Sequence, residues 1–284
     1  MYPPRRPAVV RARNITPNCT MSSDSKHTLR QLSAEEAAKL DPGEDHYRAY
    51  VGPPDQYDFM GATQFRLLTA LGLRESHSLL DFGCGSLRSG KLFIPYLLPG
   101  RYFGLDPNAW LIQESIDREL GRDIIRLKQP TFRHDDDFRP TKFGTTFDFI
   151  VAQSIFSHTG ADLAEQLLSE FWSCLKPTGL ALATFVLPHQ MDPTDGNERG
   201  WIYPGCVAFE ADTVLNFIAK AGLVGKQLSW FHPRQTWFAM AHSADILPAS
   251  AEDAELVGGL REEVARRPGL IQRLKSAVAR RIRA

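Results

Sequence analysis

The stretch LLDFGCGSLRSG, from Leu79 to Gly90, decides how the chain folds. It passes from a short apolar run into an acid and then into a corner that holds two glycines, Gly83 and Gly85. A buried strand that ends in such a corner usually leads into a helix and leaves room for a ligand to approach the backbone closely. Three kinds of ligand compete for this pattern: a dinucleotide, a nucleoside triphosphate, and a nucleoside without phosphate.

The residues around the corner argue against both phosphate-bearing ligands. A triphosphate loop needs Gly-Lys-Ser/Thr at the start of its helix, and here the chain continues with Ser86, Leu87 and Arg88. A dinucleotide loop needs a third glycine three residues after the second, where Arg88 stands. Asp81, two residues before Gly83, is poorly matched to a pyrophosphate but suits a cationic, amine-bearing ligand.

Strand and helix patterns alternate along the chain. This alternation predicts an α/β fold: a Rossmann-like, mostly parallel sheet of seven strands with helices on both faces, an antiparallel last strand and an N-terminal helical cap. Apolar runs place strands, and amphipathic segments bounded by caps, glycine or proline place helices. Six of the strands can be placed, at 77–84, 101–107, 147–155 (the fourth strand of the sheet), 177–187, 226–231 and 236–242. The expected helices are 33–40, 55–71, 86–98, 108–120, 162–175 and 212–221.

The expected domain organisation is a main α/β domain with extra segments at both ends. Within the cap, the stretch YRAYVGPPDQYD, residues 47–58, either folds back over a pocket or forms an ordinary loop packed by its aromatic residues. The divisions are a disordered basic segment at 1–28, the helical cap at 29–72, the main domain at 73–245 and a basic amphipathic tail at 246–284.

Composition limits the class of protein. The chain has 284 residues, 43% of them hydrophobic, and its 33 basic residues balance its 33 acidic ones, so no overall charge attracts it to nucleic acid. The four cysteines are scattered without a Cys-x-x-Cys pair, which argues against a disulfide framework or a structural zinc site. We therefore expect a soluble protein of the reducing cytoplasm.

The two ends differ from the middle. The first 26 residues are rich in arginine and proline and are expected to be disordered; an organelle transit peptide and a start at Met21 are the alternatives. From Gly269 the sequence GLIQRLKSAVARRIRA carries five basic residues and no acid. This tail is expected either to dock on the domain or fray in solvent, or to contact an anionic membrane surface or RNA.

A second acid and two later motifs follow the glycine corner in order. Asp106 lies about 20 residues past the corner, where an acid accepts hydrogen bonds from ribose hydroxyls. It is followed by HDDDF at 134–138 and by FDFIVAQSIFSH at 147–158. Over roughly Leu79 to His242, this combination resembles the class I S-adenosylmethionine-dependent methyltransferases, in particular bacterial members that act on small molecules or glycans.

The resemblance implies a set of residues that bind S-adenosyl-L-methionine. The glycine loop passes beneath the methionine part of this donor, the acid after the second strand holds the ribose, and an acid with an apolar neighbour holds the adenine. Arg88 departs from the glycine-rich pattern, and it either meets the donor carboxylate or lies on the solvent side of its helix. The cofactor-binding residues carried over are Asp81, Gly83, Cys84, Gly85, Arg88, Asp106, Pro107, Asp136, Asp137, Phe138, Gln153 and Ser154.

The acceptor is less defined than the donor. The Asn/Asp-Pro-Pro-Tyr motif of enzymes that methylate nucleobase amino groups is absent, and AQSI, residues 152–155, stands in its place. We therefore expect a small-molecule or glycan acceptor, methylated at oxygen. Two other functions stay open: an NAD(P)-dependent oxidoreductase, and a non-catalytic donor-binding subunit that supports a partner enzyme.

Oxygen acceptors need a base that removes a proton. His158, just past the fourth strand, is the first candidate; otherwise it serves the start of the next helix. His189 and Tyr203 flank the long segment 188–205, which is expected to be a substrate loop. No metal is expected, because Asp192, Asp195 and Glu198 match no calcium loop. Arg234, in FHPRQ, either holds an anionic acceptor or belongs to a plain hairpin corner.

Overall fold

The computed structural model describes residues 31–191 and 198–249. The expectations for the N-terminal segment 1–28, for Asp192 and Asp195, and for the basic tail beyond 249 lie outside the described residues.

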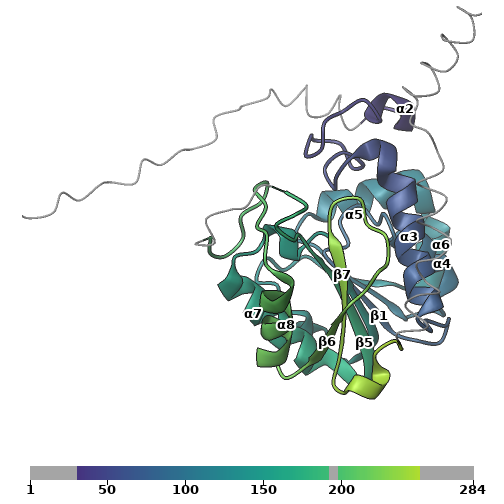
Figure 1. Ribbon diagram of the computed structural model, residues 1–284. Helices are drawn as coiled ribbons and strands as arrows, with labels where there is room; N and C mark the ends of the chain where they lie inside the picture. Colours follow the sequence, from purple (N-terminus) through teal and green to yellow (C-terminus); the bar gives the residue numbers. More distant parts are fainter. Residues whose placement is uncertain (1–30, 192–197, 250–284) are drawn as a thin grey trace, which may run out of the picture.

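A seven-stranded sheet in the order β3-β2-β1-β4-β5-β7-β6 forms the centre of the fold (Figure 1). All neighbouring pairs are parallel except the two made by β7, which runs antiparallel to β5 and β6. The predicted sheet is therefore confirmed, including the antiparallel pairing of the last two strands. The strands are β1 (Leu79–Phe82), β2 (Tyr102–Leu105), β3 (Thr131–Arg133), β4 (Phe147–Ala152), β5 (Leu175–Phe185), β6 (Val224–Gln227) and β7 (Thr236–Ala241).

Helices cover both faces of this sheet (Figure 1). Successive residues of a strand point to opposite faces, so an uninterrupted apolar strand must be buried on both. In β4, Phe149 and Val151 pack among residues of α3 and α4, whereas Ile150 and Ala152 pack among residues of α7 and α8. The covering helices are α3 (Tyr57–Ala70), α4 (Gly90–Tyr96), α5 (Ala109–Ser115) with a π-helical extension η2 (Ile116–Leu120), α6 (Arg122–Lys128), α7 (Ala161–Cys174) and α8 (Ala211–Lys220).

The N-terminal segment of the described structure, residues 31–56, contains the predicted capping box. The Ser33 hydroxyl and the Glu36 carboxylate exchange hydrogen bonds with each other and with the backbone at the start of α2 (Ala34–Ala37). The chain then passes through a turn segment and η1 (Pro54–Gln56) into α3. In Figure 1, α2 lies beyond the upper end of α3.

Some elements differ from the sequence prediction. The helix expected at 86–98 begins only at Gly90, because Leu87 has φ +54° and its N–H closes a turn on the Cys84 carbonyl. The short elements β3 and α6 were not predicted: β3 has three residues and α6 buries none. The fourth predicted strand also ends at Ala152, because Ser154 turns the backbone to φ +61°.

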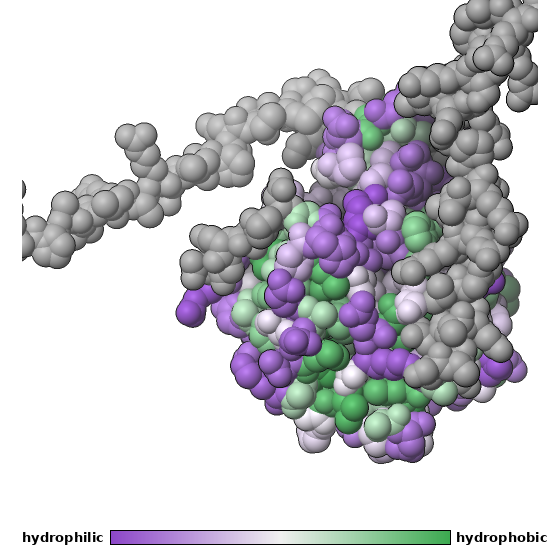
Figure 2. Space-filling view, in the orientation of Figure 1, coloured by the Kyte–Doolittle hydropathy of each residue, from purple (hydrophilic) through white to green (hydrophobic). Residues whose placement is uncertain are grey.

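Within the described residues, no helix is long and apolar enough to cross a bilayer. On the face seen in Figure 2, hydrophilic residues prevail around α2, and hydrophobic residues are more frequent toward the opposite end of the molecule.

Candidate functional site

A cavity of about 460 Å³ opens at the carboxyl ends of β1, β2 and β4. This is the edge at which open α/β sheets bind their ligands, and the volume lies in the range of small-molecule sites. The walls come from the loops after these strands, from the N-terminal segment, from residues 201–206 and from the loop between β6 and β7. The lining includes Gly43, Tyr50, Val51, Gln64, Asp81, Gly83, Cys84, Gly85, Arg88, Asp106, Pro107, Phe138, Gln153, Ser154, His158, Trp201, Tyr203, Arg234 and Gln235.

The glycine corner is shaped by close approach from both sides. Gly83 and Gly85 have φ of +72° and +51°, in the left-handed region that side chains disfavour. A Cβ on Gly85 would lie 2.7 Å from Cγ1 of Val51, and one on Gly83 would lie 2.0 Å from Cδ1 of Ile155. The corner therefore runs closely beneath the N-terminal segment and beside the β4 loop, and side chains at either glycine would crowd the cavity floor.

Asp81 lies at the end of β1 with 4% of its surface exposed. Its Oδ2 accepts hydrogen bonds from the hydroxyls of Tyr102 at 2.8 Å and Ser89 at 3.1 Å. Burial raises the pKa of Asp81 to about 6. A cation in the cavity would favour its ionised form, as expected for a ligand that carries an amine.

Asp106 ties the glycine corner to the end of β2. Its Oδ2 accepts a hydrogen bond from the Gly85 N–H at 2.9 Å, and its Oδ1 accepts one from the Asn108 N–H at 2.8 Å. The second contact is the Asx turn that an Asp-Pro sequence favours. Burial raises the pKa of this carboxyl. Asp106 thus fixes the local backbone and lines the cavity at the same time.

Of the motif HDDDF, residues 134–138, only Phe138 reaches the cavity. Phe138 lines it, with a backbone φ of +54°. Asp136 and Asp137 do not, which corrects the expectation that one of them faces the donor: Asp136 is exposed, and Asp137 forms an ion pair with Lys142. One oxygen of Asp137, Oδ1, is buried without a hydrogen-bond partner in the described part of the chain.

Gln153 and Ser154 follow β4 and meet the loop between β6 and β7. The Ser154 N–H donates to the Thr184 hydroxyl at 2.8 Å, and the Ser154 hydroxyl accepts from Nε2 of Gln235 at 3.0 Å. The side chain of Gln153 lies 3.4 Å from Nε2 of His232. Gln235 and His232 were not predicted as site residues, because the contact joins positions about 80 residues apart.

His158 has a defined orientation on the cavity wall. Its Nδ1 lies 2.6 Å from the Gly205 carbonyl oxygen, so Nδ1 carries the proton and donates it, and Nε2 keeps its lone pair. Burial lowers the pKa of His158, so the ring is neutral at pH 7. Tyr203 also lines the cavity, and its hydroxyl donates to the Tyr50 carbonyl at 3.2 Å. His189 is exposed and lies outside the lining, so its position gives its expected catalytic role no support.

Arg88 faces the cavity, which corrects the alternative that it lies on the solvent side of its helix. Its Nη1 donates to the Val51 carbonyl at 3.0 Å. Burial lowers the pKa of Arg88 to about 10, and the guanidinium is still charged at pH 7. Arg234 lines the cavity as well and donates to Oε1 of Gln56 at 3.0 Å.

The segment 47–58 folds back over the pocket, as one of its two interpretations predicted. Tyr50, Val51 and Pro53 all line the cavity. Gln64, which is 3% exposed, adds a further polar group from α3. A proline turn between aromatic residues was the only sequence signal for this arrangement.

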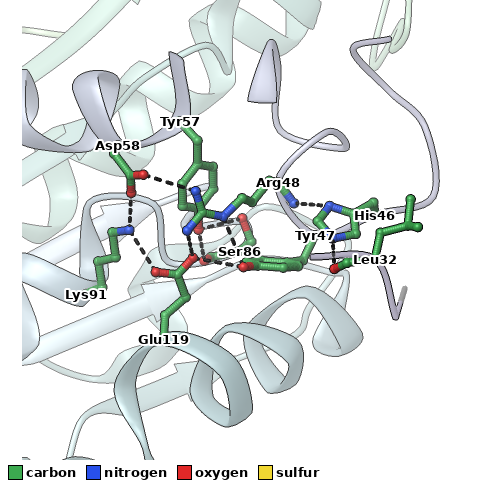
Figure 3. Close-up of polar contacts among 9 residues, drawn as sticks. All are labelled: Leu32, His46, Tyr47, Arg48, Tyr57, Asp58, Ser86, Lys91 and Glu119. Carbon is green, nitrogen blue, oxygen red and sulfur yellow. Dashed lines mark hydrogen bonds and ion pairs between the residues drawn. The ribbon is translucent and has the colours of Figure 1, made fainter. Parts of the chain in front are cut away.

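A half-buried polar network holds this segment in place (Figure 3). Glu119 pairs with Arg48 and, at 2.9 Å, with Lys91, and both cations also pair with Asp58. The Tyr47 hydroxyl accepts from Arg48 at 3.0 Å and donates to Glu119 at 2.9 Å. Arg48, Lys91 and Glu119 expose 13%, 15% and 12% of their side chains, so water screens these pairs weakly. The network joins the N-terminal segment to α4 and η2.

Replacing Glu119 with glutamine is expected to lower the free energy of unfolding by about 2 kcal/mol, because two half-buried cations then share only Asp58. Burial opposes the ionisation of Glu119, but Lys91 and its other partners hold its pKa below the ordinary 4.5. Its contribution is therefore full above about pH 4.5 and is lost as the pH falls further. Denaturant titrations at pH 7 and pH 4 measure both effects.

The matched control is Glu165, whose pair with Lys220 is 65% exposed on the lysine side. Glu165→Gln should change stability by less than about 0.5 kcal/mol. Equal effects of the two substitutions would contradict the network's role.

Gly61 is the point at which α3 packs on the turn before α4. A Cβ there would lie 2.2 Å from the Arg88 carbonyl oxygen, a backbone atom that cannot rotate away. Helix propensity alone predicts that Gly61→Ala gains about 1 kcal/mol. We expect a net loss of about 1 kcal/mol instead, because overpacking costs more than propensity returns. Thermal unfolding measures whether Gly61→Ala raises or lowers Tm. Ala62→Gly, on the exposed face of α3, is the control that measures the effect of helix propensity alone. A rise in Tm for Gly61→Ala would disprove the contact.

Comparison with known proteins agrees with this architecture. Residues 80–181 match the family model described as "Methyltransferase domain". Among solved structures, magnesium protoporphyrin IX methyltransferase from Synechocystis PCC 6803 with bound SAM superposes with a TM-score of 0.52 at 12% identity, covering 78% of this chain and 99% of that one. DesVI of Streptomyces venezuelae gives 0.50 at 17% identity, with coverages of 68% and 95%.

A third similar structure, an S-adenosylmethionine-dependent methyltransferase from Clostridium acetobutylicum, gives a TM-score of 0.51 at 10% identity, with coverages of 77% and 97%. At these identities the likeness establishes the fold. The strand order, in which an antiparallel β7 lies between β5 and β6, also differs from the 3-2-1-4-5-6 order of dinucleotide-binding folds. Residues 80–181 therefore carry a methyltransferase domain, and the chain has the Rossmann-like fold of S-adenosylmethionine-dependent methyltransferases.

Proposed function

We propose that the protein transfers the methyl group of S-adenosylmethionine to an oxygen of a small-molecule or sugar acceptor. The observation that carries the choice of oxygen is the orientation of His158. Because Nδ1 donates to the Gly205 carbonyl, Nε2 is the basic atom of a neutral ring on the cavity wall. A neutral imidazole with one fixed nitrogen is suited to take a proton from a hydroxyl as its oxygen attacks.

The cavity fits the donor in shape and charge. Gly83 and Gly85 let the corner turn tightly against Val51 and Ile155, and Asp106 presents a buried carboxylate beside it for the ribose hydroxyls. Asp81 suits the donor's ammonium group, and Arg88 suits its carboxylate. When bound, the donor supplies an activated methyl group, so the protein contributes alignment and proton removal.

The acceptor side of the cavity has flat aromatic walls. Tyr203 lies between three other rings, with centroid distances of 5.0 Å to His158, 5.8 Å to Tyr50 and 6.4 Å to Trp201. Such faces pack against ring-shaped ligands, which supports a sugar or another cyclic small molecule. The Tyr203 hydroxyl already donates to a carbonyl and burial raises its pKa, so it favours a positioning role over that of base.

The test is a methylation assay with S-adenosylmethionine that carries a carbon-13 methyl group. The purified protein is incubated with pools of hydroxylated small molecules and sugars, and products are found by mass spectrometry. The chemical shift of the labelled methyl carbon then separates methyl ethers or esters from methylamines. Labelled methyl on oxygen is the expected result; label only on nitrogen would overturn the choice of oxygen.

Two further outcomes separate the other candidate functions. Binding of the donor without product from any pool would favour a non-catalytic donor-binding subunit. Release of a nicotinamide dinucleotide from purified protein, detected by mass spectrometry, would favour an oxidoreductase.

A further inference from the structure

The charged residues of the cavity lining separate into two pairs. Asp81 and Asp106 stand at the glycine corner, and Arg88 and Arg234 are the cations. Within the described residues, the hydrogen bonds of both arginines go to uncharged acceptors, the Val51 carbonyl and the Gln56 side chain. Asp55 attracts Arg234, but it is exposed and forms no ion pair with it. A guanidinium that lines a cavity and forms no ion pair with a carboxylate can bind an anionic ligand.

His232 has a tautomer that the surrounding backbone determines. Its Nδ1 accepts hydrogen bonds from the N–H groups of Gln235 at 2.9 Å and Arg234 at 3.2 Å, so Nδ1 carries no proton. Burial, together with the positive charges of Arg88 and Arg234, lowers the pKa of His232 to about 3. The ring is therefore neutral at pH 7, and its proton must be on Nε2.

This proton sets the orientation of the Gln153 amide. Nε2 of His232 lies 3.4 Å from the end of the Gln153 side chain, and a donor there requires an amide oxygen as its partner. With the oxygen turned to His232, the buried Oε1 that otherwise lacks a partner is satisfied. This requires the amide to be turned over from its placed orientation, in which Nε2 of Gln153 faces His232. The N–H groups then take the buried position of Oε1, where the described residues offer no acceptor.

Ser154 adds a further donor beside Gln153. Its hydroxyl oxygen accepts from Nε2 of Gln235 at 3.0 Å, which leaves the hydroxyl proton to donate elsewhere. Arg234, Gln153 and Ser154 thus bring a cation and two neutral donors to the wall formed by the loops after β4 and before β7. Such a set of donors favours an anionic ligand over a neutral one.

We propose that the acceptor is a carboxylate-bearing small molecule, whose carboxylate binds Arg234 with help from the Gln153 amide and the Ser154 hydroxyl. The inference rests on the proposed function, in which Arg88 serves the donor's carboxylate. The lining's two acids and two arginines cancel. The donor brings a sulfonium, an ammonium and one carboxylate, a net charge of +1, and a monoanionic carboxylate restores neutrality. A phosphate, with a charge of about −1.5 to −2, would leave the occupied cavity with a net negative charge.

The test uses full-length protein that is first titrated with S-adenosylhomocysteine and then saturated with sinefungin, a non-reactive donor analogue whose ammonium replaces the sulfonium and keeps the net charge of +1. Matched probes are then titrated by calorimetry. The pairs are glucuronate and glucose, and benzoate and benzyl alcohol, whose members share a ring and differ in the carboxylate. Inorganic phosphate is the third probe. We expect the carboxylate member of at least one pair to bind about tenfold or more tightly than its neutral counterpart, because a neutral ligand leaves Arg234 desolvated and unpaired. We also expect this preference to disappear in Arg234→Gln.

The control variant is Arg101→Gln, an exposed arginine at the start of β2, at the edge of the sheet opposite the cavity, which should keep the preference. Equal binding within both pairs, or a preference that survives Arg234→Gln, would overturn the inference. Phosphate binding more tightly than both carboxylates would also overturn it. Failure of the proposed function is distinguishable, since S-adenosylhomocysteine itself would then not bind.

Discussion

Asp106→Ala is expected to weaken binding of S-adenosylhomocysteine by about 100-fold, which corresponds to ~2.7 kcal/mol. Two causes add. The variant loses the carboxylate proposed to hold the ribose, and it leaves the N–H groups of Gly85 and Asn108 without their acceptor. Hydrogen bonds to a charged group contribute about 1.5–3 kcal/mol each, so the loss of one or two such bonds accounts for this figure. Calorimetric titration of the by-product measures the effect without knowledge of the acceptor.

Asp136→Ala is the control for this experiment. Asp136 belongs to the acidic run that the sequence associated with adenine, but it is exposed and outside the cavity lining. Its replacement should leave affinity within about twofold of wild type, well inside the spread of surface substitutions. Wild-type affinity in Asp106→Ala, or an equal loss in both variants, would contradict the donor site described above.

His158→Gln is expected to lower kcat about 100-fold with an oxygen acceptor, because general-base catalysis typically contributes a factor of about 10²–10⁴. The affinity for S-adenosylhomocysteine should change little. Burial holds the pKa of His158 below 6.5, so the neutral base is already the main form at pH 7. The wild-type rate should therefore rise with pH through a value below 6.5 and then stay level, and the variant should lack this rise.

His189→Gln provides the matched control, since this histidine belongs to the same long connection after β5 but is exposed and outside the lining. It should retain the wild-type rate and pH profile. A rate that falls less than about threefold in His158→Gln would remove this residue as the base and leave alignment alone to explain catalysis.

Local signals were sufficient for most of the fold. The apolar runs of β1, β4 and β5, the spacing of apolar residues in the long helices and the glycines after α3 and α8 are local signals, so α3, α7 and α8 are found within two residues of where the sequence predicts them. The short elements β3 and α6 escaped prediction because three residues at the sheet edge and a helix without buried residues carry little periodicity. Their places depend on β2 and α4, against which they pack.

The residues of the candidate site were likewise predictable only where they lie close together in the sequence. Asp81, Gly83, Gly85 and Asp106 could be identified from sequence because strand, glycine corner and acid follow one another within 26 residues. It could not be predicted that Phe138, and none of the aspartates in HDDDF, lines the cavity, since the turn at Phe138 and the pair of Asp137 with Lys142 decide it. The direction of Arg88 likewise depends on the Val51 carbonyl, which lies 37 positions away.

By itself, the sequence determined most of the order of strands and helices, the glycine corner and the two acids beside it, Asp81 and Asp106, because each is set by contacts among near neighbours in the chain. Only the tertiary structure decided the acceptor side of the cavity. There Gln56 meets Arg234 across 178 positions, and Tyr50 meets Tyr203 across 153. Such contacts form when the sheet brings its loops to one edge, so no periodicity or motif in the chain records them.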